Sequence, residues 1–272
     1  MIIGIASGVY LNFPIDETIR RIAAAGYDSV DVWSGRPHVY RRDFNSLELK
    51  QLKQLIKERN LEISSFLPAF HRYPYRLCSP NGTIQQDSIL YMKECMDNAV
   101  ALGSPILLIV PGRSIHGQSI ADAWNRLLES LNTICQYAQQ YEIKLGVEFV
   151  NIHESDLVNS SKAAMRVIDE LQYENLGIVI DTGHVNLGSE TFRDAVRTTG
   201  DRLIQVHVND NDGKQQQNLI PGDGNFDFDE LVDVLNGIKY DGTITAELGY
   251  QYTLNPDIAA RTTAQQLRNM LS

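Results

Sequence analysis

The chain has 272 residues, of which 43% are hydrophobic, and a formal net charge of −10 at pH 7. This negative charge argues against a nucleic-acid partner or an anionic membrane surface, because both attract positively charged proteins. No run of the sequence approaches the ~18 apolar residues of a membrane span. A small neutral or cationic substrate fits the composition better.

The first predicted element is a strand in MIIGIASGVYLNF, which lacks the basic start of a signal peptide. Seven further strand-like runs follow it, and each is followed by a helical pattern. The eight runs cover residues 2–7, 29–34, 62–67, 105–110, 144–150, 176–181, 203–209 and 242–248. Runs such as ILLIV are apolar on consecutive residues, which is typical of parallel strands that are covered on both faces.

The helical signal is clearest over residues 119–141, where apolar side chains recur every three or four positions from Trp124 to Ala138. Eight βα units predict an α/β fold, the (β/α)8 TIM barrel, as a single domain over residues 1–272, close to the roughly 250 residues typical of this fold. An open doubly wound sheet is the alternative, but no strand is followed by a GxGxxG or P-loop motif.

The three cysteines, Cys78, Cys95 and Cys135, are odd in number and lack the paired spacing of a metal site. Cys95 and Cys135 fall on the apolar faces of predicted helices. We therefore expect buried, reduced thiols and a cytoplasmic location.

Four ionisable residues stand at the carboxyl ends of the last four predicted strands. They are separated by 33, 26 and 40 residues, about one βα unit each: Glu148, Asp181, His207 and Glu247. Strand ends converge in a barrel, so these side chains should meet in one hole. Three carboxylates and one imidazole are hard ligands, which favour one divalent cation, Mn²⁺ first and Mg²⁺ or Co²⁺ as alternatives. Any one of them alone would more often cap a helix or pair with an arginine.

Further polar and aromatic residues follow the strands and are predicted to bind substrate. Glu154 in EFVNIHE and His184 in DTGH lie in the loops beyond two of the expected ligands. His38 follows the second strand, and His71 and Tyr75 in HRYPY follow the third. Such side chains could line a sugar-sized pocket, although a helix cap or a structural role is an alternative for each.

With these residues placed, the chain resembles the xylose isomerase-like barrel superfamily, and within it the ketose 3-epimerases typified by D-tagatose 3-epimerase. The resemblance spans nearly the whole chain. The segments YDSVDVWSGRPHVY, YPY and NDNDGKQQQNLIPGDGNF look most like those of fructoselysine 3-epimerases. The resemblance implies that the Glu, Asp, His and Glu set holds the metal and that Glu154 and His184 contact the sugar. It also implies that the protein forms a homodimer or homotetramer.

One departure concerns the loop after the seventh strand. The simple-sugar epimerases carry a substrate-binding arginine here, whereas this chain has Gly213 within NDNDGK. Asp210, Asp212 and Asp223 leave the loop acidic, which would suit a cationic amine on the sugar; a solvated acidic loop is the alternative. A ketose-amine of the fructoselysine or psicoselysine kind is therefore expected beside the free ketoses.

The resemblance implies inversion at C3 of a 2-keto sugar through a cis-enediolate. Glu148 and Glu247 would act as bases on opposite faces of this intermediate, while Asp181 and His207 would be ligands only. The alternatives are a free-ketose 3-epimerase acting on tagatose, psicose or fructose, an inosose dehydratase-like lyase, a multi-zinc endonuclease and a sugar-binding protein without activity.

Overall fold

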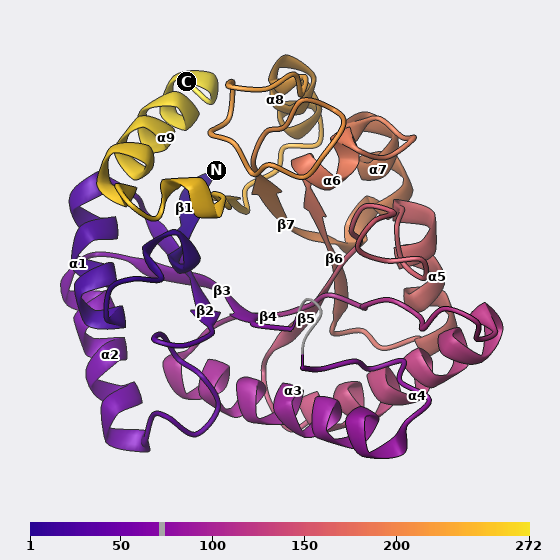
Figure 1. Cartoon of the computed structure of the whole chain (residues 1–272). Helices are drawn as coiled ribbons and strands as arrows, with labels where there is room; N and C mark the ends of the chain where they lie inside the picture. The colour runs from indigo at the N-terminus through magenta and orange to yellow at the C-terminus, as the bar shows by residue number, and fades with distance from the viewer. Residues whose placement is uncertain (71–73) are drawn as a thin grey trace.

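Eight parallel strands close into a barrel in chain order in the computed structural model, which describes residues 1–70 and 74–272 (Figure 1). Their bounds lie close to those expected from the sequence, and the predicted (β/α)8 barrel is confirmed. The strands are β1 (Ile2–Ala6), β2 (Ser29–Ser34), β3 (Glu62–Pro68), β4 (Ile106–Ile109), β5 (Lys144–Glu148), β6 (Leu176–Asp181), β7 (Leu203–Val208) and β8 (Thr243–Ala246).

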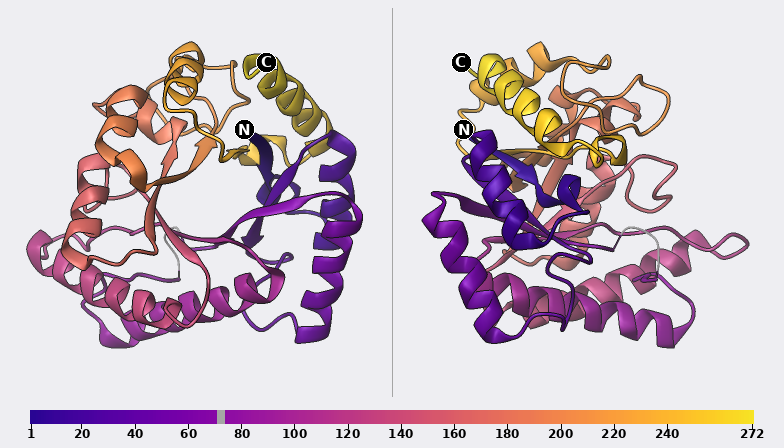
Figure 2. Two further views of the ribbon diagram at one scale, coloured as in Figure 1. Left: turned by 180° about the vertical axis from the view of Figure 1, so that it is seen from behind. Right: turned by 60° about the vertical axis from the view of Figure 1, so that its left-hand side comes forward.

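Helices form a layer outside the barrel, as the views from the front, the back and one side agree (Figures 1 and 2). The α-helices are α1 (Ile15–Ala25), α2 (Ser46–Glu58), α3 (Gly82–Leu102), α4 (Ile120–Ala138), α5 (Ser161–Leu171), α6 (Thr182–Asn186), α7 (Phe192–Thr199), α8 (Phe228–Gly237) and α9 (Pro256–Met270). Three short 3₁₀ segments are η1 (Ser7–Tyr10), η2 (Gly200–Arg202) and η3 (Tyr250–Tyr252).

Local sequence signals explain where several helices begin and end. Asn45 caps α2 in a capping box, because its side chain accepts from the amides of Leu47 and Glu48 while Glu48 accepts from the Asn45 amide. Gly26 ends α1 and Gly103 ends α3, both with the left-handed backbone that glycine adopts without strain. The apolar stripe expected over 119–141 is the buried face of α4.

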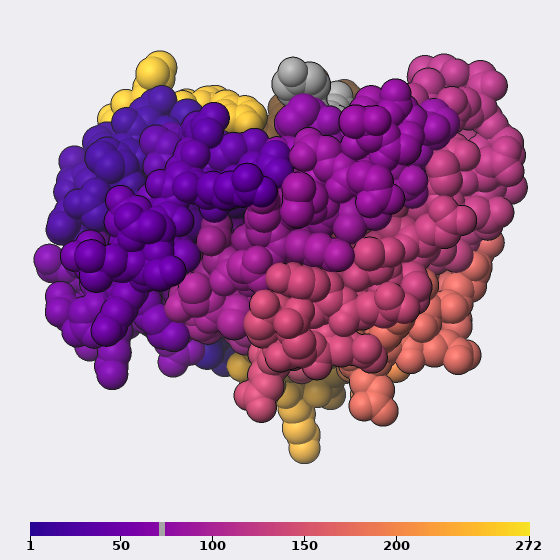
Figure 3. Space-filling view, turned by 90° about the horizontal axis from the view of Figure 1, so that it is seen from below, coloured from indigo at the N-terminus to yellow at the C-terminus, as the bar shows by residue number. Residues whose placement is uncertain are grey.

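Two hydrophobic layers hold the barrel. A large one lies between the strands and the helices, and a small one fills the barrel interior with Ala6, Leu67, Leu108 and Val179. The space-filling view shows the helical layer as a continuous surface on the side where α3 and α4 lie (Figure 3). Gly177 faces the interior, where a Cβ would meet the side chain of Ile204 at 2.5 Å. The interior is thus packed apart from its mouth.

β1 pairs with β8 and closes the ring, so the two termini lie near each other (Figures 1 and 2). Cys78, Cys95 and Cys135 are all buried and free, as expected from the sequence. Within the described ranges, no helix combines the length and the apolar character that crossing a bilayer requires.

Candidate metal centre

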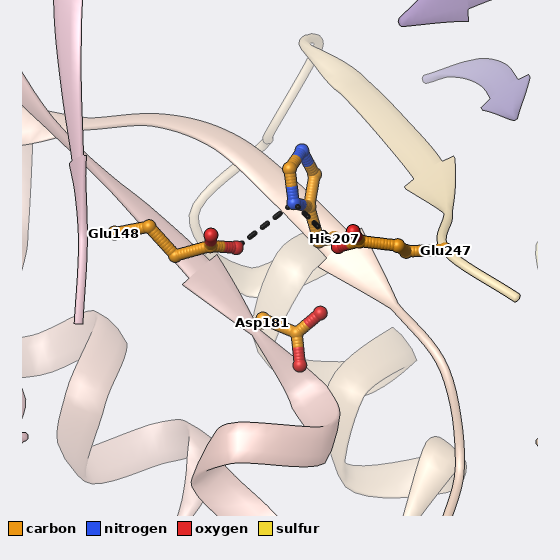
Figure 4. A group of neighbouring side chains, drawn as sticks. All are labelled: Glu148, Asp181, His207 and Glu247. Atoms are coloured by element: carbon orange, nitrogen blue, oxygen red, sulfur yellow. Dashed lines mark hydrogen bonds and ion pairs between the residues drawn. The ribbon is translucent and has the colours of Figure 1, made fainter. Parts of the chain in front are cut away.

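The four ionisable residues expected at the strand ends come together at the mouth of the barrel. Glu148 ends β5, Asp181 ends β6, His207 lies near the end of β7, and Glu247 directly follows β8. Each offers one ligand atom, and these atoms all lie within 4.8 Å of one another. Figure 4 shows the carboxylates of Glu148 and Glu247 approaching from opposite sides, with His207 between them and Asp181 beside them.

The register of the sheet accounts for this convergence. Asp181 and His207 are paired residues on β6 and β7, and Glu148 pairs with the residue two positions before Asp181. Side chains two apart on a strand point to the same face, so Glu148 and Asp181 both turn inward. The amide of Glu247 donates to the carbonyl of Val208 at 3.0 Å, which extends the ladder by one residue and places Glu247 beside His207.

His207 is fully buried and both of its ring nitrogens face carboxylates. Nδ1 lies 2.9 Å from Glu148 Oε1 and 3.5 Å from Glu247 Oε2. Nε2 lies 3.1 Å from Asp31 Oδ2, on the side away from the cluster. Nδ1 is therefore the atom that faces the other three ligands.

Asp181 is held by two donors. The amide of His184 donates to Oδ1 at 3.0 Å, and the side-chain amide of Asn209 donates to Oδ2 at 2.6 Å. Asp181 thus caps α6, as the alternative interpretation of this residue supposed, and also belongs to the cluster. Burial raises the pKa of Asp181 to about 7, with Glu148 and Glu247 adding to the rise and the nearby histidines opposing it.

Burial by itself would lower the pKa of His207. The Glu148 carboxylate and the hydrogen bonds to Asp31, Glu148 and Glu247 outweigh it and raise the pKa well above its usual value. Both shifts have one origin: the cluster concentrates negative charge among three buried side chains, Glu148, Asp181 and His207, and it draws protons to compensate. A divalent cation would supply that positive charge instead, and the oxygen and imidazole donors suit a hard or borderline ion. The cluster could therefore hold a metal ion.

A cavity of about 540 Å³ opens above the cluster and includes Glu148 and Glu247 in its wall. Its lining is apolar on one side, with Trp33, Leu67 and Phe70, and carries amides on the other. The described lining residues include no lysine and no arginine. A phosphate-bearing substrate would find no lysine or arginine among these described residues, so this part of the wall favours a neutral or cationic ligand.

Glu154 and His184, predicted from the sequence, both line this cavity. The buried side chain of Asn151 connects them, because its amide nitrogen lies 3.2 Å from Glu154 Oε1 and 3.1 Å from His184 Nδ1. If that nitrogen donates to the ring, His184 carries its proton on Nε2 and can donate from there. These positions agree with substrate contact.

His38 and Tyr75 lie behind the cavity wall, and this geometry does not support the substrate contacts predicted for them. His38 is buried, its ring nitrogens bond to Ser7 and to the Phe13 carbonyl, and burial lowers its pKa to about 4. Tyr75 is 3% exposed, and its ring stacks on Phe70 with centroids 5.8 Å apart. Each thus supports a lining residue, Trp33 or Phe70. The predicted His71 falls outside the described residues.

The acidic loop after β7 has a structural role that the sequence interpretation missed. Asp210 is 1% exposed and accepts from the amides of Gly222, Gly224, Phe226 and Asn211. Asp212 and Asp223, like Asp210, are absent from the described cavity lining. The expectation that this acidic loop suits an amine thus gains no support from these three carboxylates, and the Asp210 carboxylate instead folds the loop. The residues of this loop that line the cavity are Gln216, Gln217 and Asn218.

The sequence interpretation also passed over three buried polar residues that hold the site: Asp31, Asn151 and Asn209. A signal existed for Asp31, since a carboxylate in the middle of the apolar strand SVDVWS requires buried partners. Asn209 lies two residues beyond His207 and shares its face of the chain. Asn151 lies in a loop, where no periodicity marks an inward side chain.

Comparisons with known proteins agree with this geometry. Residues 19–270 match the family described as xylose isomerase-like TIM barrel. The chain belongs to this family. Among curated members, fructoselysine 3-epimerase of Escherichia coli O157:H7 is 26% identical over 258 residues, which cover 95% of this chain and 94% of that protein. This bears out the resemblance inferred from the sequence.

Solved structures of similar fold superpose over the whole chain. D-psicose 3-epimerase from Clostridium cellulolyticum H10, crystallised with D-tagatose, has a TM-score of 0.83 at 17% identity and covers 100% of both chains. The IOLI protein, solved with a zinc atom, has a TM-score of 0.83 at 16% identity and covers 100% of this chain and 98% of that one. At these identities the likeness establishes the fold.

Proposed function

We propose that the protein is a divalent-metal-dependent epimerase that inverts C3 of a ketose or of a ketose-amine. The observation that carries this proposal is the placement of Glu148 and Glu247, whose carboxylates face each other across the cluster (Figure 4). Inversion of a carbon that carries a proton requires one base on each side of it. The similarity to fructoselysine 3-epimerase over 95% of the chain supports the same conclusion.

Glu148, Asp181, His207 and Glu247 would hold the cation, for which we propose Mn²⁺, with Mg²⁺ or Co²⁺ as substitutes. When bound, the cation would act as a Lewis acid toward the C2 carbonyl and C3 hydroxyl oxygens of the sugar and lower the pKa of the C3 proton. The residues would share the remaining tasks. Asp181 and His207, both fully inside the barrel, serve as ligands.

Glu148 and Glu247 each direct one oxygen toward His207, which leaves the second oxygen of each carboxylate for proton transfer. One glutamate takes the C3 proton and gives a cis-enediolate; the other returns a proton to the opposite face. Glu154 and His184 in the wall hold sugar hydroxyls. The apolar residues opposite exclude water from the intermediate.

For the substrate we propose a fructoselysine-like ketose-amine. The cavity of about 540 Å³ is larger than a single hexose needs, and its described lining carries carboxylates but no cationic side chain to repel an amine. Gly213 adds to this: its φ of +74° belongs to the left-handed region, so the turn suits glycine at the position where simple-sugar epimerases carry an arginine. Free ketoses are the second candidate, supported by the sequence similarity to D-psicose 3-epimerase of Agrobacterium fabrum, which is 21% identical over 239 residues.

A substrate panel tests this choice. The Mn²⁺-loaded protein would be assayed with fructosyl-lysine, psicosyl-lysine, fructose, psicose and tagatose, with products separated by chromatography and weighed by mass spectrometry. We expect the highest kcat/KM with the two lysine adducts and products of unchanged mass. A preference for the free ketoses would replace the ketose-amine by the second candidate, and a product lighter by one water would indicate a lyase instead.

A further inference from the structure

We propose that Asp31 is a positioning residue of the metal centre: it accepts the Nε2 proton of His207 and thereby directs the Nδ1 lone pair toward the cation. Asp31 lies in β2, three strands from β5 and Glu148 in the ring, and its carboxylate faces the His207 nitrogen that points away from the cluster. This inference rests on the metal site of the proposed function, but it is independent of which sugar is the substrate.

Asp31 is 0% exposed, and burying a carboxylate without partners costs several kcal/mol. Four side chains supply the partners. Oδ1 accepts from the hydroxyls of Ser64 and Thr245, and Oδ2 accepts from Gln205 Nε2 at 2.8 Å and lies 3.1 Å from His207 Nε2. These donors come from β3, β7 and β8. The barrel therefore contains a fixed acceptor directly behind the imidazole.

The proton positions follow from the acceptors. An ionised Asp31 carboxylate only accepts hydrogen bonds, so Ser64, Thr245 and Gln205 must donate to it. His207 is a fourth donor if its Nε2 carries a proton. A neutral imidazole has one ring proton, so Nδ1 then carries the lone pair. Nδ1 faces only acceptors, Glu148 at 2.9 Å and Glu247 at 3.5 Å. A lone pair among carboxylates is stable only with a cation between them, so Asp31 selects the form of His207 that binds metal.

An isosteric variant separates this role from simple packing. In Asp31→Asn the amide oxygen can still accept from His207 and Gln205, and the amide nitrogen can donate to the Ser64 and Thr245 hydroxyls, so the fold is retained while the charge behind the ring is lost. Partners of this kind typically change metal affinity by about 10- to 100-fold. We expect isothermal titration of the metal-free variant with Mn²⁺ to give a Kd raised by that factor.

The matched control is Thr245→Val, which removes the hydroxyl that donates to Asp31 and accepts from Gln205. The Thr245 side chain makes no hydrogen bond to His207 or to the cluster, and valine keeps the backbone pairing of this position with His207. We expect its Kd for Mn²⁺ to stay close to that of the wild type. Equal weakening in both variants, or an unchanged Kd in Asp31→Asn, would overturn the positioning role and leave the metal site intact. Absence of Mn²⁺ binding by the wild type would overturn the metal site and this inference together.

A second measurement needs no variant. Protein labelled with ¹⁵N at its histidines would be loaded with Zn²⁺, which is diamagnetic, and the ring nitrogens observed by long-range ¹H–¹⁵N correlation. We expect the histidine that responds to zinc to show a metal-bound Nδ1 and a protonated, slowly exchanging Nε2. Zinc on Nε2 with the proton on Nδ1 would contradict the proposal whatever the behaviour of the variants.

Discussion

The affinity of the metal centre for a cation should depend steeply on pH. A cation must displace the protons of its ligands, and two ligands hold protons near neutrality in the metal-free protein. Burial, with Glu148 and Glu247, raises the pKa of Asp181 to about 7, and the surrounding carboxylates raise the pKa of His207 well above its usual value despite burial. Lowering the pH protonates both groups, so the sign is a loss of affinity toward acid.

The pKa of Asp181 alone sets a minimum size for this effect. With its pKa at about 7, Asp181 is roughly three-quarters ionised at pH 7.5 and only about 3% ionised at pH 5.5, which costs about 25-fold in affinity. The raised pKa of His207 adds a further loss of affinity in the same direction, because its proton must also leave before the cation binds. Binding therefore weakens by more than about 25-fold, or about 2 kcal/mol, over this range.

Calorimetric titration with Mn²⁺ between pH 5.5 and 7.5 measures this directly. Repeating the titration at pH 7 in buffers of different ionisation enthalpy counts the protons released, and we expect between one and two. His153→Gln, a change outside the cluster, serves as the control for general pH effects. A Kd that varies less than about tenfold over the range, or binding without proton release, would refute the assignment of Asp181 and His207 as ligands.

Three further outcomes follow from the site. Glu148→Gln and Glu247→Gln should each lower kcat by about 10²- to 10⁴-fold, the usual contribution of a general base, while the circular dichroism spectrum stays native. Near-normal turnover by either variant would contradict the two-base scheme. Chelation should abolish turnover, and Mn²⁺ should restore it; full activity of metal-free protein would contradict a catalytic cation. Mn²⁺ at a hundred times its Kd should stabilise the fold by about 2.7 kcal/mol and raise the Tm by roughly 5 to 10 °C, and an unchanged Tm would count against binding to the folded state.

The barrel was predictable because each of its units carries its own signal. Apolar runs such as ILLIV mark strands buried on both faces, and the stripe from Trp124 to Ala138 marks a helix with one buried face. Eight repeats of this pattern leave few topologies, and the described structure adopts the expected one. The boundaries differ by a few residues where a strand continues as extended chain, as at Glu247.

The ligand set was predictable for a related reason, since residues at strand ends converge in any barrel. What the sequence did not indicate is which polar side chains reach the site from loops or from inside a strand. Asn151 is one case, and Asp31 is another, because a side chain on β2 meets His207 on β7 only after the barrel closes. Asp210 is the opposite case, because the sequence suggested a carboxylate near the substrate. In the structure this carboxylate accepts hydrogen bonds from backbone amides of its own loop. Such partners depend on the loop fold, which periodicity does not describe.

The most direct test of the account is exchange of the C3 hydrogen with solvent. The Mn²⁺-loaded protein would be incubated in D₂O with fructosyl-lysine and with the free ketoses, and the C3 position followed by NMR. Because the proton removed by one glutamate and the proton delivered by the other need not be the same, we expect deuterium at C3 of the epimerised product, and its loss in Glu148→Gln and Glu247→Gln. Epimer formed without deuterium at C3, or no exchange with any of these sugars, would contradict C3 inversion by two glutamate bases.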